Sequence, residues 1–364
     1  MNPLRILYAN AGLGDSEVER YTYDLMHAMR DQGHHVEALC PPQAQLKQRL
    51  EQDGFKVHGL TMTGGWGVWR NAFTLKGFLA AQRFDVVHTQ SHSDTLHVGI
   101  AARLAGGSLV VRTQHLSQSY SALASRWLPH RVIASSQFVK NTCVQKGVPA
   151  RYIEVVYPAV VTPNSSAVVK LRQRLGLANE AVLIGSTVLA HQEKNALELI
   201  QALAPLMRAH AQLHLIVTNE TSQHDLLSAF AEQLGVGAHV HQLQAQESIS
   251  SFMHELDVFA LATPNEASAL MFAAAAAAQV AVVATQAGSI PEMMAVGQSG
   301  MLVPVHDIVA LRKALQRVID DPDLRQSMAM AGYEYTVGSG RFTLPTMQQL
   351  IENHYRQWLR QRNP

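Results

Sequence analysis

The sequence predicts an α/β protein with two doubly wound domains, each built on a parallel sheet. Its 364 residues suffice for two domains at about 150 residues each. Short β-branched runs alternate with helical patterns along almost the whole chain, which is typical of parallel sheets wrapped by helices. The alternation is interrupted in residues 158–166 by two prolines and small polar residues, and we place the linker between the domains there.

Composition excludes several classes of protein. Apolar residues make up 47% of the chain and charged residues 16%, which excludes disorder as the main state. The formal charge is +1, so there is no overall field to attract nucleic acid. Cys40 and Cys143 form neither a disulfide framework nor a thiolate metal cluster, and no charged-then-apolar leader opens the chain. We therefore expect a cytoplasmic protein.

Seven strands alternate with helices in the first half of the chain. They are predicted at residues 4–9, 35–39, 57–60, 85–89, 109–113, 132–135 and 153–157. The first helix has one apolar face, which includes Tyr21, Leu25 and Met29, and it ends at Gly33 in the position of a C-cap. Such a helix is expected to pack on the sheet.

The second half repeats the pattern, with strands predicted at residues 181–187, 213–218, 239–243, 258–261 and 280–285. No charged residue occurs from Ala267 to Pro291, a length that could span a membrane. The segment is rich in alanine and interrupted by polar residues, so we interpret it as a buried helix followed by a buried strand. The predicted domains are residues 1–162 and 163–342.

The turn after the first strand is a candidate binding loop. Open parallel sheets bind ligands beyond the carboxyl ends of their strands, so two facing domains predict a ligand in the cleft between them. Backbone N–H groups around Gly12 and Gly14 can approach a phosphate or a sugar hydroxyl, and a purely geometric role for both glycines is equally open. The third glycine of a dinucleotide fingerprint and the acidic residue after the second strand are missing, which disfavours a nicotinamide-dependent oxidoreductase.

Four side chains near strand ends are candidates for chemistry. His88 and His115 follow strands, where an imidazole can donate to a substrate or exchange a proton, and His115 is the better candidate. The chain has 18 histidines, so ordinary packing is the alternative, and neither histidine has the spacing of a metal site. Lys194 can neutralise a diphosphate or lie solvated on a loop. Glu266 precedes a helix, which it can cap, or it acts in a site.

Short motifs occur in a characteristic order over nearly the whole chain. They are residues 16–20 (Ser-Glu-Val-Glu-Arg), 33–36, 85–88 (Asp-Val-Val-His), 113–115, 132–136, 194, 263–266, 287–292 and 299–304. This order and spacing resemble the retaining glycosyltransferases of family 4, which have the two-domain GT-B fold. The closing segment resembles the family's last helix, so residues 343–364 are expected to pack back on the N-terminal domain.

The resemblance implies transfer of a sugar from a nucleotide-diphosphate donor to a hydroxyl acceptor, with retention and without a metal or other cofactor. It implies that Lys194 binds the diphosphate, that Glu266 contacts the donor sugar and that His115 stands near the reacting centre. The further donor-binding positions implied are Gly14, Ser268, Ala269 and Leu270. The expected role is in bacterial lipopolysaccharide or surface polysaccharide synthesis, with a lipid-linked or glycan acceptor.

Two positions depart from the family pattern. The second glutamate of the family's Glu-x7-Glu motif falls on Ala274, and the arginine that partners the lysine falls on Leu189. Two lost charge-assisted contacts of about 1.5 to 3 kcal/mol each would weaken nucleotide binding by roughly two to four powers of ten. A non-catalytic relative acting as a binding or scaffold subunit therefore stays open, as does a nucleotide-sugar epimerase on the same fold.

An aromatic and basic segment from Trp66 to Phe78, and a second around Trp127, lie in the more basic half of the chain. Such a face can rest on anionic lipid. Two interpretations therefore stay open. Ordinary helix packing with a solvated rim is the favoured one, and peripheral contact with the inner face of the cytoplasmic membrane is the alternative.

Overall fold

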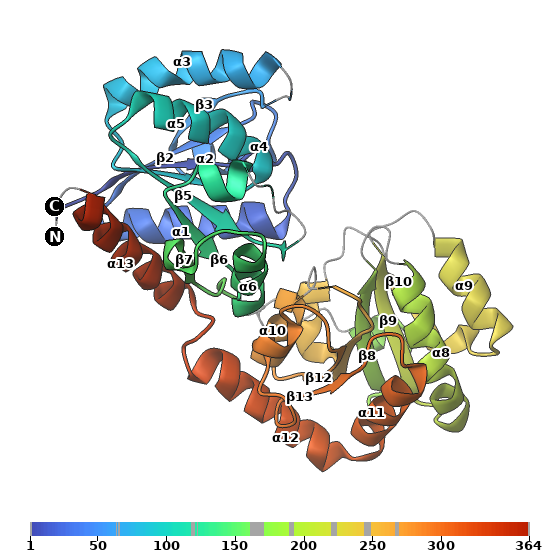
Figure 1. Cartoon of the computed structure of the whole chain (residues 1–364). Helices are drawn as coiled ribbons and strands as arrows, with labels where there is room; N and C mark the ends of the chain where they lie inside the picture. The colour runs from blue at the N-terminus through green and yellow to red at the C-terminus, as the bar shows by residue number, and fades with distance from the viewer. Residues whose placement is uncertain are drawn as a thin grey trace. The chain divides into compact units, whose positions relative to one another are not determined.

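The computed structural model divides the chain into two units (Figure 1). The first unit comprises Met1–Ala159 and Thr343–Pro364, and the second comprises Val160–Phe342. The described residues are 2–62, 64, 66–117, 121, 123–160, 171–188, 193–219, 224–243, 249–265 and 269–362. Most of the expected linker, residues 161–166, lies outside them.

The first unit is built on a seven-stranded parallel sheet in the order β3-β2-β1-β4-β5-β6-β7. The strands are β1 Arg5–Ala9, β2 His35–Cys40, β3 Lys56–Gly59, β4 Val86–Thr89, β5 Leu109–Gln114, β6 Arg131–Ala134 and β7 Ile153–Val155. The central strand β4 is buried along its whole length. This matches the apolar runs expected of a strand covered on both faces.

Helices cover both faces of the first sheet. They are α1 Glu17–Asp31, α2 Gln45–Gln52, α3 Trp66–Gln82, α4 His92–Asp94, α5 Ile100–Ala105, α6 Gln137–Gln145 and α13 Leu344–Arg362, with π-helical turns η1 Thr95–Gly99 and η3 Leu123–Trp127. One face packs against α1, α2 and α13, and the other against α3 and α5 (Figure 1). The last helix of the chain thus completes the core of the first unit, where Met347, Ile351, Tyr355 and Trp358 are buried.

The second unit has a six-stranded parallel sheet in the order β10-β9-β8-β11-β12-β13. The strands are β8 Val182–Val188, β9 Leu213–Asn219, β10 Val240–Leu243, β11 Val258–Leu261, β12 Ala281–Thr285 and β13 Gly300–Val303. The helices are α7 Leu171–Arg174, α8 Glu193–Ala209, α9 His224–Gln233, α10 Ala269–Ala277, α11 Ile308–Asp320 and α12 Pro322–Tyr333. The expectation of two parallel-sheet α/β domains is confirmed.

The charge-free segment forms a buried helix and a buried strand, as its alanine content predicts. In α10, Phe272 is fully buried and its ring lies 5.4 Å from that of Phe259 on β11. All five residues of β12 are buried. Across the described part of the chain, none of the helices combines the length and the apolar character that a membrane crossing requires.

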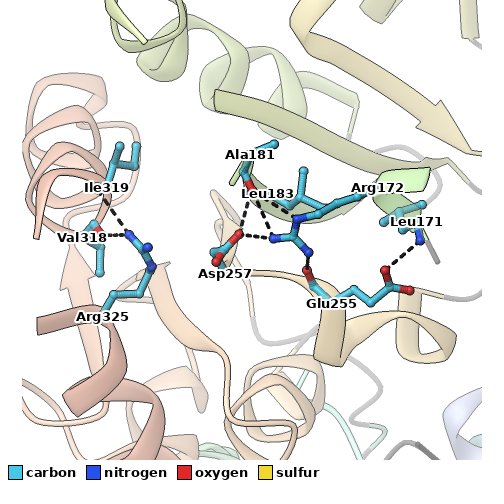
Figure 2. A network of polar contacts seen from close by, with 9 residues as sticks. All are labelled: Leu171, Arg172, Ala181, Leu183, Glu255, Asp257, Val318, Ile319 and Arg325. Carbon is cyan, nitrogen blue, oxygen red and sulfur yellow. Dashed lines mark hydrogen bonds and ion pairs between the residues drawn. The ribbon is translucent and has the colours of Figure 1, made fainter. Parts of the chain in front are cut away.

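A network around Arg172 fastens the short helix α7 to the second sheet (Figure 2). The Arg172 guanidinium donates to the carbonyl oxygens of Ala181 and Glu255, at 3.1 and 2.8 Å, and pairs with Asp257 at 2.8 Å. Asp257 also accepts the backbone N–H of Leu183 on β8 at 2.8 Å. The first described helix of the second unit is thus tied to its central strands.

Candidate functional site

The turn after β1 is organised by the carboxylate of Glu19. Ser16 caps α1 by accepting the N–H of Val18 at 3.3 Å, and Glu19 accepts the backbone N–H of Ser16 at 3.0 Å. A Cβ added at Gly12 would lie 1.9 Å from Glu19 Oε1, whereas one at Gly14 would meet nothing within 4 Å. Gly12 is therefore required by close approach, while Gly14 lies exposed on the turn. Since Glu19 already occupies the positive end of α1, this turn favours a sugar hydroxyl over a phosphate.

His115 lies directly after β5 and is half-buried. Its Nε2 is 3.0 Å from Oε1 of Gln90, and its ring packs edge-on against Tyr21 of α1 with centroids 4.9 Å apart. An amide oxygen only accepts, so Nε2 carries the proton and donates. Burial, together with the positive charge of Arg112, lowers the pKa of His115 to about 3. The ring is therefore neutral near pH 7, with Nδ1 left as an acceptor.

Gln90 follows β4 and is the partner that orients His115. Its side chain is 3% exposed, and its Nε2 has no hydrogen-bond partner among the described residues. A buried amide donor without a partner costs free energy, and a ligand hydroxyl at this position would satisfy it. The sequence contains the signal for Gln90, because the residue directly follows a strand, as His115 does. Its residue type does not mark it as a candidate, because an amide carries no titratable chemistry.

The fully buried carboxylate of Asp94 holds the backbone directly after β4. Asp94 accepts the backbone N–H groups of Gln90 and Ser91, at 3.2 and 2.8 Å. Burial raises the pKa of Asp94 to about 6, against hydrogen bonds from Ser91 and the charge of Arg112, which lower it. Arg112 donates to Thr95 Oγ1 at 3.2 Å and to Gln114 Oε1 at 3.1 Å. The loop that carries Gln90 is thus held by charge-assisted hydrogen bonds.

His88 has a different role from His115. Its ring is fully buried, with Nε2 2.7 Å from Thr113 Oγ1 and Nδ1 hydrogen-bonded to the Tyr355 hydroxyl of α13. Burial, and to a lesser extent the nearby His115, lower its pKa to about 3. Both ring nitrogens are engaged, so His88 holds α13 on the sheet and is not available to a substrate.

Candidate residues of the second unit are described in part. Lys194 is exposed in the first turn of α8. Ala269 and Leu270 are the first two described residues of α10. Ala274 is half-buried within α10. The positions of Glu266, Ser268 and Leu189 lie outside the described residues.

The segment leading to Glu266 is fixed at its start. Thr263 follows β11, and its N–H donates to Thr285 Oγ1 at the end of β12, at 2.8 Å. The Thr285 hydroxyl in turn donates to the Thr263 carbonyl at 2.5 Å. Two neighbouring strand ends of the second sheet are therefore joined directly before the position of Glu266.

Among the described residues, no group of three or more His, Cys, Asp and Glu side chains is placed to hold a metal ion. The polar groups gathered at strand ends are instead hydrogen-bonding amides, hydroxyls and a neutral imidazole. Such groups suit a ligand rich in hydroxyls.

Two family models match consecutive parts of the chain. One, described as Glycosyltransferase Family 4, matches residues 18–163, and the other, described as Glycosyl transferases group 1, matches residues 170–335. Together they cover most of both parallel-sheet units, but not β1, the turn after it or the closing helix.

Curated relatives match part of the chain. A D-inositol 3-phosphate glycosyltransferase of Corynebacterium kroppenstedtii is 28% identical over 223 residues, 57% of this chain and 49% of that protein. A GDP-mannose-dependent alpha-(1-6)-phosphatidylinositol monomannoside mannosyltransferase of Mycolicibacterium smegmatis is 25% identical over 262 residues, 66% of this chain and 68% of that protein. The chain thus spans about half the length of the first relative.

A solved structure shares the fold over nearly the whole chain. The crystal structure of Anabaena Alr3699/HepE in complex with UDP and glucose has a TM-score of 0.81 at 21% identity, covering 97% of this chain and 100% of that one. At this identity the likeness concerns architecture. It agrees with the two parallel sheets described above.

Proposed function

The chain belongs to the glycosyltransferases of family 4 and has their GT-B fold, and from this premise we propose that it transfers a sugar from a nucleotide-diphosphate donor to a hydroxyl acceptor with retention. The observation that carries the proposal is the match of both family models, in order, to the two units. One relative, described as a GDP-mannose-dependent phosphatidylinositol monomannoside mannosyltransferase, supports a nucleotide-sugar donor and a lipid-linked acceptor. We propose a lipid-linked glycan of the bacterial surface, such as a lipopolysaccharide, as the acceptor.

In this proposal, His115 contributes a neutral, oriented imidazole. With a pKa of about 3 the imidazole is not protonated near pH 7 and cannot act as a general acid. Its role is therefore to donate or accept a hydrogen bond. Gln90 fixes which ring nitrogen donates and adds an unpartnered amide N–H of its own. Such groups position a sugar hydroxyl.

The donor is assigned to the second unit. We propose that Lys194 neutralises the diphosphate, that the N–H groups of Ser268, Ala269 and Leu270 stabilise it, and that Glu266 contacts the donor sugar. Positioning and electrostatic stabilisation of the leaving diphosphate would supply the rate enhancement. The proposal needs neither a covalent nucleophile nor a resident metal.

A non-catalytic binding subunit is the second candidate. It is favoured by one observation, the alanine at position 274 of α10, which places a methyl group where the family has a ribose-binding carboxylate. With Leu189 in place of the arginine, the donor loses two charge-assisted contacts. The two candidates therefore differ in whether the wild-type chain binds a nucleotide.

Calorimetric titration of the purified protein with UDP, GDP, ADP and CMP separates the two candidates. An active transferase is expected to bind one of them in the micromolar range, which also names the donor class. The titration is repeated with an Ala274→Glu, Leu189→Arg variant and with Ala278→Glu, a half-buried alanine one turn further on, as the matched control. If only the double variant binds, the binding-subunit function replaces catalysis.

A further inference from the structure

Helix α3 carries large apolar side chains on its exposed side as well as on its buried side. Ala72, Leu75 and Leu79 are buried against the first sheet. On the other side Trp66 is 90%, Trp69 54% and Phe73 69% exposed. A helix that is apolar all round is normally buried, and a contiguous exposed apolar patch marks an interaction site. The outer face of α3 therefore requires a partner.

The position of α3 is fixed, so its aromatic residues cannot fold inward. Asn71 is buried, and its amide donates to the Thr61 carbonyl at 2.8 Å and lies 3.0 Å from Nδ1 of His97 on η1. Turning the helix to hide Trp66 and Trp69 would break these buried hydrogen bonds. The aromatic face is held outward by the packing beneath it.

Other exposed apolar side chains lie over the same face of the sheet. The helix α6 packs on Val132 and Ala134, which lie on the sheet face that carries α3 and α5, and η3 is joined to that face by the hydrogen bond from Ser125 to Gln114. Seven of the fourteen large apolar side chains exposed in the described residues belong to α3, α5, η3 and α6: Trp66, Trp69, Phe73, Leu104, Trp127, Phe138 and Val144. Exposed apolar side chains on this face are thus not confined to α3.

This face presents almost no negative charge. Residues 54–153 contain eleven lysines and arginines and two aspartates, Asp85 and Asp94. Asp94 is fully buried, and Asp85 accepts the backbone N–H of Arg5 at 2.8 Å. Exposed basic residues of the face include Arg70, Lys76 and Arg103, and within the described chain none of these three forms an ion pair. The charge of this face therefore favours an anionic partner.

The opposite face of the same sheet differs in charge. Its helices carry acidic residues as well as basic ones: Glu17, Glu19, Asp24 and Asp31 on α1, Glu51 on α2 and Glu352 on α13. The asymmetry between the two faces is local, because the net charge of the chain is +1. It gives the first unit one side that an anionic surface attracts.

We propose that the face formed by Trp66, Trp69, Phe73, Trp127, Arg70, Lys76 and Arg103, the aromatic-basic face, docks on a bilayer rich in anionic phospholipid. Tryptophan rings are stable at the water–lipid boundary, and basic side chains are attracted to anionic headgroups. A second copy would bring like charges together. A nucleic acid would leave Leu104 and Val144 without a partner, because aliphatic side chains do not stack on bases as aromatic rings do.

The inference rests on the proposed function in one respect: a bilayer-docked first unit meets a lipid-linked acceptor at the membrane surface. Docking itself needs neither donor nor acceptor. It is measured by co-sedimentation of the full chain with vesicles of phosphatidylcholine and phosphatidylglycerol at 3:1, and with pure phosphatidylcholine. Transfer to a water-soluble acceptor is measured separately, so failure of docking and failure of catalysis are distinguished.

We expect binding to the anionic vesicles to be at least about tenfold tighter than to the neutral ones, and to weaken between 50 and 500 mM NaCl. Trp66→Ser, Trp69→Ser and Phe73→Ser together should weaken it at least about tenfold. The matched control is Val296→Ser, Val309→Ser and Met330→Ser, three side chains of the second unit that are 54%, 58% and 62% exposed. The control should bind like the wild type.

Charge is tested independently by Arg70→Glu with Lys76→Glu, which should weaken binding at least about tenfold, against Lys313→Glu with Arg317→Glu on α11. This pair keeps the test decisive should the aromatic variant fail to fold. The proposal is overturned if the wild type does not bind anionic vesicles. It is equally overturned if the folded aromatic or charge variants of the face bind these vesicles as tightly as their control variants do. It is also overturned if light scattering shows a dimer that only the aromatic variant dissociates, because the face would then be an interface between copies.

Discussion

At the scale of single residues, the contact between His115 and Gln90 carries the most specific claim about the first unit. The amide oxygen of Gln90 accepts from Nε2, which selects one tautomer of a ring whose pKa is about 3. A leucine at position 90 keeps the side-chain volume but removes the acceptor. The imidazole of His115 should then populate both tautomers, because no other described residue forms a hydrogen bond with its Nε2.

We therefore predict that Gln90→Leu lowers kcat for sugar transfer by about tenfold or more while leaving the unfolding midpoint nearly unchanged. Nitrogen-15 NMR of the imidazole should show the Nε2–H tautomer in the wild type and a mixture in the variant. His92→Ala, an exposed histidine on α4, serves as the control. An unaltered tautomer signal in Gln90→Leu would refute the positioning role.

The buried His88 predicts loss of stability in acid. Its folded pKa of about 3 lies below the value of about 6.5 in an unfolded chain. Below pH 6.5 the imidazole of His88 is therefore protonated in the unfolded state but not in the folded state. As the pH is lowered, the free energy of unfolding falls by about 1.4 kcal/mol per pH unit until the folded pKa is reached. From pH 6.5 to 5 the contribution of His88 is about 2 kcal/mol.

Urea unfolding at pH 7, 6 and 5 measures this dependence. His88→Gln should be less stable than the wild type at pH 7, since hydrogen bonds to Thr113 and Tyr355 are lost or weakened, but its slope with pH should be shallower. His35→Gln, at an exposed position on β2, should keep the wild-type slope. Equal slopes in all three proteins would show that folding does not lower the pKa of His88.

His88 and His115 also show how far the sequence determines the site. Both follow the same rule, a histidine at a strand end. That His88, and not His115, is bound by the last helix depends on the pairing of Tyr8 with His88 and on the return of α13 to that face. The first follows from strand register, while the second is a contact between residues 267 positions apart, which no local pattern encodes.

At the scale of elements, Arg172 connects α7 to a 3-10 turn and to the residues directly before β8 and β11 (Figure 2). We predict that Arg172→Met lowers the free energy of unfolding by about 1 to 3 kcal/mol, since methionine retains the apolar stem but leaves Asp257 and two carbonyls without this donor. Asp257 is partly exposed, so water replaces some of the loss.

Differential scanning calorimetry of Arg172→Met measures the effect, with Arg317→Met on the exposed side of α11 as the control. A transition of the variant that coincides with the control would mean that water satisfies the network equally well. A shift confined to one of two transitions would assign the loss to the second unit.

Elements are well predicted where the apolar pattern is continuous. The twelve strands expected from β-branched runs all occur with ends within two residues, and α10 and β12 follow from the charge-free segment. In the described chain β13 is an additional strand. It begins with Gly300, whose Cβ would meet Met294 Sδ at 2.5 Å, and glycine and methionine weaken a strand signal. Its existence depends on pairing with β12, a tertiary cause.

At the scale of the whole molecule, the first unit is assembled from two pieces of chain separated by the entire second unit. The residues of α13 that complete its core, Met347, Ile351, Tyr355 and Trp358, are almost fully buried. Removing α13 would expose apolar surface on β1 and α1, including Ile6 and Met29. Residues 2–160 alone should therefore form a compact state without fixed side-chain packing.

The two points where the chain leaves and re-enters the first unit lie together, because the N–H of Val160 donates to the carbonyl of Phe342 at 2.8 Å. A linker of about four Gly and Ser residues, which can reach roughly 13 Å, can thus replace the whole second unit. We predict that residues 2–160 joined in this way to residues 342–364 unfold in one cooperative thermal transition and give a dispersed amide NMR spectrum.

The control carries Tyr355→Ala and Trp358→Ala in the joined chain, which should lose the transition because two large buried side chains each contribute about 3 to 5 kcal/mol. Residues 2–160 without α13 should behave like this control. If they instead melt as cooperatively as the joined chain, α13 is dispensable to the core. The hydrogen bond between His88 and Tyr355 would then only attach α13 to a sheet that is stable without this helix.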